Sequence, residues 1–169
     1  VEEVPKATLR QDDDIVIRVV RTCVCGSDLW FFRGLSRQAA HSQVGHESIG
    51  VVEEVGAAVE SVKPGDFVVV QFPYSCGKCP VCKAGFESVC PHGGYFSACQ
   101  AEYLRVPEAD GTVVKVPGSS EDYDDATLAS LLTISDVMST GYHAAASADV
   151  KPGDTAVVMG DGAVGLCGV

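Results

Sequence analysis

A run of four cysteines constrains this chain more than any other feature. They are Cys76, Cys79, Cys82 and Cys90, separated by two, two and seven residues. Thiolates three positions apart on a tight, glycine-containing loop can converge on one ion, and a fourth completes the tetrahedron of a closed zinc site. An iron–sulfur cluster is the main alternative, but its fourth cysteine follows after a shorter gap. Disulfides are a third option. We predict a zinc lobe over residues 76–90.

The composition limits the classes of protein that remain. The chain has 169 residues, 46% of them hydrophobic, enough for one good-sized domain or one domain with part of another. Its net charge of −11 argues against a nucleic-acid partner. No apolar run of about 18 residues and no signal-peptide pattern occurs, so we expect no membrane span and a reducing, cytoplasmic compartment. Since the chain starts at Val1 and stops at Val169 after a glycine-rich turn, we expect that both ends have been cut.

Short β-branched stretches predict a mainly β fold. Five of them occur, at residues 15–24, 49–55, 67–72, 101–106 and 112–116. Many short strands at close spacing indicate a barrel or a sandwich. The pentapeptide VKPGD occurs twice, at residues 62–66 and 150–154, and we interpret it as one turn conformation used twice rather than as a duplication.

From Ser119 onward the pattern changes from strand to helix. Acidic residues precede leucines at helical spacing, and a second helix is expected over residues 137–148. A buried strand is then predicted at residues 156–159, directly before a GxGxxG sequence. This context favours a dinucleotide-binding loop over a plain glycine-rich turn. The cofactor-binding candidates are Gly160, Gly162, Ala163, Val164 and Gly165.

Four further potential metal ligands lie outside the lobe, at predicted strand ends or at the helix junction. They are Cys25, His46, Glu47 and Asp136. A thiolate, an imidazole and a carboxylate can form an open zinc site, in which one position stays free for water or substrate. Taken singly, each residue has an ordinary interpretation as a small buried cysteine, an interior histidine or a solvated carboxylate. Their combination with a second metal site and a dinucleotide loop favours a functional site.

Six ordered motifs resemble those of the zinc-dependent medium-chain dehydrogenases of the alcohol dehydrogenase type. Besides the cysteine lobe, they are CGSD at 25–28, GHE at 45–47, VKPGD at 62–66, DVMSTG at 136–141 and GDGAVG at 160–165. The resemblance implies a GroES-like, partly open β-barrel over residues 1–136, which is the catalytic domain. It also implies linking helices and the first strand of a Rossmann domain over residues 137–169.

The same resemblance implies two zinc ions per chain. Cys25, His46 and Asp136 would bind the catalytic zinc, with Glu47 as an exchanging ligand, and the lobe cysteines would hold a structural zinc. Zinc would acidify an alcohol, and a hydride would pass between it, or its aldehyde or ketone partner, and NAD or NADP. The full-length protein would be a homo-oligomer, a dimer or tetramer, and the chain alone would have little activity. A zinc-stabilised binding module and a zinc-free reductase of the quinone oxidoreductase kind are the alternatives.

Two neighbours of Cys25 also match the family. Ser27 resembles the hydroxyl that takes the substrate proton, and Asp28 the carboxylate that orients the ligand histidine, here His46. In the ordinary interpretation, Ser27 and Asp28 cap a short helical turn. The aromatic run Trp30, Phe31 and Phe32 lines a substrate pocket or simply packs.

The last cysteines receive no role from the sequence. They are Cys23, Cys99 and Cys167, which we expect to be buried.

Overall fold

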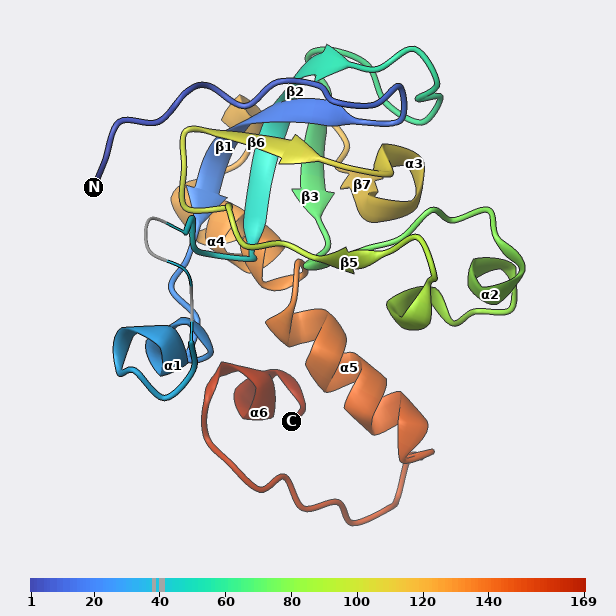
Figure 1. Cartoon of the computed structure of the whole chain (residues 1–169). Coiled ribbons are helices and arrows are strands. Elements are labelled where there is room, and N and C mark those ends of the chain that lie inside the picture. Colours follow the sequence, from blue (N-terminus) through green and yellow to red (C-terminus); the bar gives the residue numbers. More distant parts are fainter. Residues whose placement is uncertain (38, 40–41) are drawn as a thin grey trace.

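A five-stranded antiparallel sheet forms the centre of the molecule (Figure 1). The computed structural model describes residues 1–37, 39 and 42–169. The strands lie in the order β6-β1-β2-β3-β7. Their bounds are Ile15–Thr22 for β1, Ser48–Val55 for β2, Phe67–Val70 for β3, Tyr103–Val106 for β6 and Val113–Lys115 for β7. The predicted mainly β architecture is therefore confirmed, with each strand close to the stretch expected for it.

Strand β3, which lies between β2 and β7, is buried on both faces of the sheet. Val68 and Val70 belong to one hydrophobic cluster, whereas Phe67 and Val69 belong to another. The second cluster is closed by leucines of α4 (Asp125–Thr133), which packs behind β1 and β2. Each such side chain stabilises the fold by about 1.5–3 kcal/mol relative to an exposed one. The two buried faces explain why these strands read as continuous apolar runs.

A small hairpin carries the cysteine lobe away from the sheet. It consists of β4 (Pro73–Tyr74) and β5 (Gly94–Tyr95). The lobe between these two strands contains the short helix α2 (Pro80–Lys83) and the 3-10 turn η1 (Glu87–Val89). In Figure 1 it projects from one side of the sheet.

The remaining helices are short. They are α1 (Asp28–Phe32), α3 (Ala109–Thr112), the 3-10 turn η2 (Ser120–Asp122), α5 (Val137–Ser147) and α6 (Ala163–Cys167). The helices expected after residue 119 and over residues 137–148 are confirmed as α4 and α5. Within the described part of the chain, no helix is both long and apolar enough to span a membrane.

The repeated VKPGD sequence adopts one turn conformation at both places. The Lys63 N–H donates to Asp66 Oδ2 at 3.0 Å, and the Lys151 N–H donates to Asp154 Oδ2 at 2.9 Å. The glycines that precede the two aspartates have φ values of 90° and 96°. The prediction of one turn used twice is confirmed.

The prediction of a strand at residues 156–159 was wrong: this segment forms no strand and pairs with none of the strands in the described part of the chain. Val157 is 84% exposed and Met159 is 94% exposed, although the sequence pattern suggested burial. A parallel strand is stabilised only by neighbouring strands of its sheet, and among the described residues none lies beside it. The apolar pattern alone therefore does not produce a strand here.

Candidate metal centres

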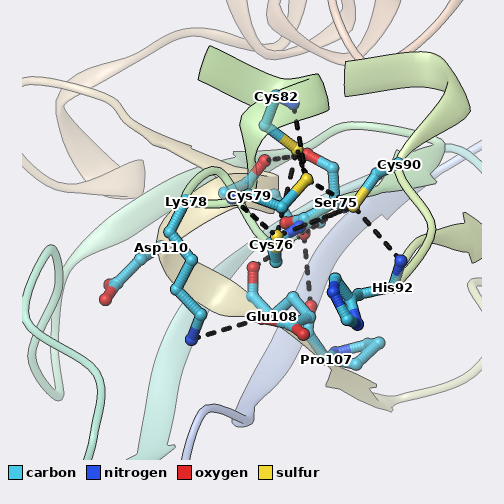
Figure 2. A network of polar contacts seen from close by, with 12 residues as sticks. Ser75, Cys76, Lys78, Cys79, Cys82, Cys90, His92, Pro107, Glu108 and Asp110 are labelled. Carbon is cyan, nitrogen blue, oxygen red and sulfur yellow. Dashed lines mark hydrogen bonds and ion pairs between the residues drawn. The ribbon is translucent and has the colours of Figure 1, made fainter. Parts of the chain in front are cut away.

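The four lobe cysteines converge on one point (Figure 2). The sulfur atoms of Cys79 and Cys82 lie 3.5 Å apart, and those of Cys76 and Cys90 lie 3.7 Å apart. The distances from Cys76 to Cys82 and from Cys79 to Cys90 are both 4.0 Å. Zinc–sulfur bonds of about 2.3 Å imply sulfur–sulfur edges of about 3.8 Å in a tetrahedron. The four sulfur donors and their spacing therefore fit a zinc ion. The sulfur–sulfur distances are far too long for disulfide bonds, which measure about 2.05 Å.

Backbone N–H groups surround the lobe sulfurs. The Cys79 and Cys82 N–H groups each donate to the sulfur three residues earlier, at 3.4 Å in both cases. Cys90 Sγ accepts from the N–H groups of Cys76 and His92, and these hydrogen bonds outweigh burial and lower the pKa of the Cys90 thiol. Such donors stabilise thiolates, the form in which cysteine binds metals.

The base of the lobe is tied to the sheet through Ser75. Its N–H donates to Thr112 Oγ1 at 3.3 Å, and its hydroxyl donates to the Gly111 carbonyl at 3.0 Å. Thr112 is buried and donates in turn to the Glu108 carbonyl at 2.8 Å. These contacts join the end of β4 to α3, which directly precedes strand β7 of the sheet, so the packing of the lobe and that of the sheet are coupled.

A second group of donors forms where three strands end. Cys25 follows β1, while His46 and Glu47 directly precede β2. The antiparallel register pairs Thr22 with Ser48, and the Thr22 hydroxyl donates to the Glu47 carbonyl at 2.9 Å. The end of β1 and the start of β2 are therefore neighbours.

Asp136 reaches the same place through the end of β3. Ser48 pairs with Val70, so the end of β3 also lies beside the start of β2. Two residues further on, the Phe72 N–H donates to the Ser135 carbonyl at 3.0 Å. That hydrogen bond holds Asp136 next to His46. As a result, one donor atom from each of Cys25, His46, Glu47 and Asp136 lies within 4.8 Å of the others.

His46 lies at the centre of this second group. Its Nε2 atom is 3.3 Å from Asp136 Oδ2 and 3.6 Å from Glu47 Oε1, while Nδ1 faces Asp28 Oδ1 at 3.6 Å. The contact with Asp136, opposed by burial and aided by Cys25 and Asp28, raises the pKa of His46 to about 9. The contact with His46, opposed by burial, lowers the pKa of Asp136.

The carboxylates of Glu47 and Asp136 lie close together here, an arrangement that favours binding of a cation. Glu47 is only 3% exposed, and isolated carboxylates at such depth are costly unless they are paired or bind a metal. A thiol, an imidazole and carboxylates are ligands that zinc accepts, and together they form a harder, more negative site than the all-sulfur lobe. The donor chemistry of the second group therefore fits zinc.

Two polar side chains next to this group were not singled out from the sequence. The Thr140 hydroxyl donates to Asp136 Oδ1 at 2.7 Å, and Gln100 Nε2 donates to Asp28 Oδ2 at 3.4 Å. Thr140 lies in the first turn of α5, four residues after the N-cap residue Asp136, and this spacing is a signal that would have identified Thr140. Gln100 comes from a distant segment, so no local pattern points to it.

The two neighbours of Cys25 behave differently. Asp28 caps the turn, because its Oδ2 atom accepts the Cys25 N–H at 2.9 Å. The Ser27 side chain is exposed and forms no capping hydrogen bond, so the ordinary interpretation was wrong for Ser27.

The aromatic run lies on the surface. Trp30 is 57%, Phe31 42% and Phe32 87% exposed, and α1 has no buried residue. The expectation that these rings pack was wrong, because α1 is too short to cover a neighbour and lies away from the sheet (Figure 1).

The cysteines without a predicted role differ in burial. Cys99 is fully buried as expected, but Cys23 and Cys167 are partly exposed. Burial and a hydrogen bond with Glu47 raise the pKa of Cys23 to about 12, so its thiol stays protonated beside the second group. The expectation of burial was therefore wrong for two of the three, whose segments lie near the surface.

The glycine loop forms a tight turn that leads into α6. Gly160 has a φ of 113°, a region that glycine tolerates, and Gly162 occupies the N-cap position of α6. A Cβ atom on Gly165 would lie 2.0 Å from the Gly160 carbonyl oxygen, so only glycine fits there. Ala163 and Val164 open the helix. The loop is therefore compact without the predicted strand before it.

The fold and the sequence together define the class of protein. Residues 11–118 match the alcohol dehydrogenase GroES-like domain, and the chain belongs to this family. The resemblance drawn from the six motifs, and the GroES-like fold that it implied, are thereby confirmed.

Individual relatives come from bacteria and fungi. The chain is 40% identical over 183 residues to an uncharacterised zinc-type alcohol dehydrogenase-like protein of Bacillus subtilis, covering 98% of this chain and 47% of that protein. It is 42% identical over 179 residues to the zinc-type alcohol dehydrogenase B of Aspergillus flavus, covering 99% and 40%. The chain thus spans about half the length of the curated relatives it matches.

Solved structures show the same architecture. An alcohol dehydrogenase from Thermus sp. ATN1 superposes with a TM-score of 0.88 at 33% identity, covering 99% of this chain and 49% of that one. A protein from Sinorhizobium meliloti, solved with NADP, superposes with a TM-score of 0.73 at 25% identity, covering 96% of this chain and 46% of that one.

Proposed function

We propose that this chain is the zinc-binding, catalytic part of an oxidoreductase that transfers a hydride between an alcohol, or its aldehyde or ketone partner, and a nicotinamide cofactor. The observation that carries this proposal is the convergence of Cys25, His46 and Asp136 from three separate segments on one point. An open site with one thiol, one imidazole and one carboxylate leaves a coordination position for substrate. The four-sulfur lobe has no such position and is proposed to be structural.

The proposed ligands of the catalytic zinc are Cys25, His46 and Asp136, with Glu47 close enough to exchange onto the ion. Zinc held there would supply a Lewis acid that polarises an alcohol or carbonyl oxygen. The proposed ligands of the structural zinc are Cys76, Cys79, Cys82 and Cys90.

The protein's own groups orient this site. Asp28 faces Nδ1 of His46 at 3.6 Å, which would favour a proton on that nitrogen when Nε2 binds a metal, and Nε2 is directed toward the other ligands. The exposed hydroxyl of Ser27, two residues after Cys25, is proposed to take the substrate proton and release it toward solvent. His46 also packs edge-on against Phe72 with ring centroids 6.1 Å apart, which limits rotation of the imidazole.

The cofactor is proposed to bind at the glycine loop. Gly160, Gly162, Ala163, Val164 and Gly165 would bring backbone N–H groups close to a pyrophosphate. The NADP in the Sinorhizobium meliloti structure supports a nicotinamide cofactor, and the proposal covers both NAD and NADP. Residues 1–136 would then form the catalytic domain, and residues 137–169 would be the start of the dinucleotide-binding domain.

The setting of the protein is part of the same proposal. Thiol ligands must stay reduced, which supports a reducing compartment such as the cytoplasm. We propose a homo-oligomer, a dimer or tetramer, for the longer protein, with a small-molecule substrate and neither nucleic acid nor membrane as a partner.

Counting zinc in the purified chain tests this proposal. We expect two zinc ions in freshly purified protein and one in a Cys25→Ala variant. A Cys167→Ala variant, which alters a thiol outside both groups, is the control and should retain two. One zinc in both the unmodified chain and Cys25→Ala would overturn the catalytic site and leave a binding module stabilised by its lobe. No zinc in either would favour the zinc-free reductase.

A further inference from the structure

The two carboxylate oxygens of Asp136 have different partners, because the Thr140 side chain forms a hydrogen bond with only one of them. Thr140 lies on α5, one turn after Asp136, and its hydroxyl donates to Oδ1 at 2.7 Å. The other oxygen, Oδ2, lies 3.3 Å from Nε2 of His46. Oδ1 thus faces the helix, whereas Oδ2 faces the cluster of ligands.

The backbone supports this arrangement. The Thr140 N–H donates to the Asp136 carbonyl at 2.8 Å, and the Ser139 hydroxyl donates to the same carbonyl at 2.8 Å. Asp136 has an unusual backbone conformation with φ −147° and ψ −74° and forms no capping hydrogen bond with its side chain. Its carboxylate is therefore held by Thr140 rather than by the helix N-terminus.

A carboxylate ligand can bind a metal through one oxygen or through both. Free rotation of the group would let either oxygen approach an ion, or both at once, and the second mode would fill a position that an open site needs. A hydroxyl that donates a hydrogen bond to one carboxylate oxygen favours binding of the metal through the other oxygen alone. It also lowers the entropy cost of binding, because the side chain is already oriented.

We propose that Thr140 is a positioning residue for the catalytic metal site: its hydroxyl retains Oδ1 of Asp136 and leaves Oδ2 as the single oxygen presented to the ion. This inference rests on the proposed function, since it presumes a metal among Cys25, His46 and Asp136. It adds Thr140, in the first turn of α5, to the residues that shape the site.

The chemistry of the ligand sets a condition on this role. Only a ligand with two equivalent donor atoms, such as a carboxylate, needs a hydrogen bond that keeps one of them away from the ion. A thiolate at position 136 has a single donor atom, so the Thr140 hydroxyl should then contribute nothing to metal binding. The role of Thr140 is therefore linked to aspartate at this position.

A matched pair of variants tests the proposal. Thr140→Val keeps the shape of the side chain and removes the hydroxyl, and Thr140→Ser keeps the hydroxyl. We measure zinc retention against a competing chelator and the visible absorption spectrum after cobalt replaces zinc in the open site. Thr140→Val should weaken metal binding there by about 10–100-fold and shift the cobalt bands. Thr140→Ser should resemble the unmodified chain. The lobe zinc serves as an internal standard for correct folding.

A double-mutant cycle separates positioning from a merely structural role. In an Asp136→Cys background, Thr140→Val should change metal affinity less than about twofold. An equal loss in both backgrounds, or a lower unfolding temperature of the metal-free chain without loss of affinity, would overturn the inference. If the unmodified chain binds two zinc ions and Thr140→Val binds both equally well, the inference fails while the proposed function stands. One zinc in the unmodified chain overturns the proposed function itself.

Discussion

Asp28 and His46 face each other across the end of the sheet, with Oδ1 of the carboxylate 3.6 Å from Nδ1 of the imidazole. The opposite nitrogen, Nε2, faces Asp136 and Glu47. Asp28 is held in turn by the Cys25 N–H and by Gln100. One carboxylate thus links a proposed thiol ligand to a proposed imidazole ligand.

Replacing Asp28 should therefore weaken the open metal site without touching a ligand. Asp28→Asn removes the negative charge behind His46, and we expect a loss of about 10–100-fold in zinc affinity at this site. Chelator competition measures it. Gln100→Ala removes the 3.4 Å hydrogen bond to Asp28, together with a 3.1 Å hydrogen bond to the Cys23 carbonyl, and should cost less. Unchanged affinity in Asp28→Asn would contradict the orienting role.

The lobe should contribute to stability, since its thiolates are tied through Ser75 to the sheet. Cys90→Ser should lose one zinc and lower the unfolding temperature by roughly 5 °C or more. Calorimetry with parallel metal analysis measures both. Cys167→Ser, outside either group of ligands, should leave both unchanged. A Cys90→Ser variant that keeps two zinc ions and full stability would exclude the structural role.

A buried ion pair makes the fold sensitive to acid. Asp14, fully buried at the start of β1, accepts from Arg105 Nε at 2.6 Å and from Nη2 at 2.7 Å. Burial opposes its ionisation, but hydrogen bonds from Arg105 and from the Arg10 and Gln11 N–H groups hold the pKa of Asp14 below its usual value.

Because the pKa is lower in the folded chain than in the unfolded chain, the ionised group stabilises the fold above the unfolded pKa of about 3.9. This contribution is lost as the pH falls through the folded pKa. At pH 7, Asp14→Asn should destabilise the fold by about 3–5 kcal/mol, and the difference from the unmodified chain should shrink below about pH 4. Urea unfolding at several pH values measures this.

The exposed ion pair between Arg21 and Asp125 provides the control for Asp14. The side chain of Asp125 is 90% exposed, so Asp125→Asn should cost no more than about 1 kcal/mol at any pH. Equal effects of the two substitutions would refute the assignment of the acid sensitivity to Asp14.

The isolated 169-residue chain should turn over alcohols slowly at best. Among the described residues, the segment before the glycine loop has no strand partner, and Val157 and Met159 are exposed, so the proposed dinucleotide-binding surface is not assembled there. Cofactor reduction with an alcohol panel, followed by absorbance, measures this. Rates near 10 per second, typical of enzymes, would contradict the expectation.

Much of the fold was predictable because its signals are local. Turn residues and β-branched runs identified the five strands of the sheet, and leucine spacing identified α4. The exception is the stretch at residues 156–159, whose apolar pattern is that of a buried strand. Its exposure shows that hydrophobic pattern predicts a strand only where partner strands exist to accept its hydrogen bonds.

The two candidate metal centres also differ in how far they could be predicted from local sequence. The sequence by itself determined the lobe, because four cysteines within one short loop have few other ways to satisfy their chemistry. For Cys25, His46, Glu47 and Asp136 it supplied suitable donor types, and their joint role in a catalytic zinc site was implied only by the resemblance of the surrounding motifs. Tertiary structure decided that these four meet: the register of β1 on β2, and of β2 on β3, brings three strand ends together. It also decided that Thr140 and Gln100 hold the acids of the site, since hydrogen-bond geometry depends on the packing of segments that are distant in the chain.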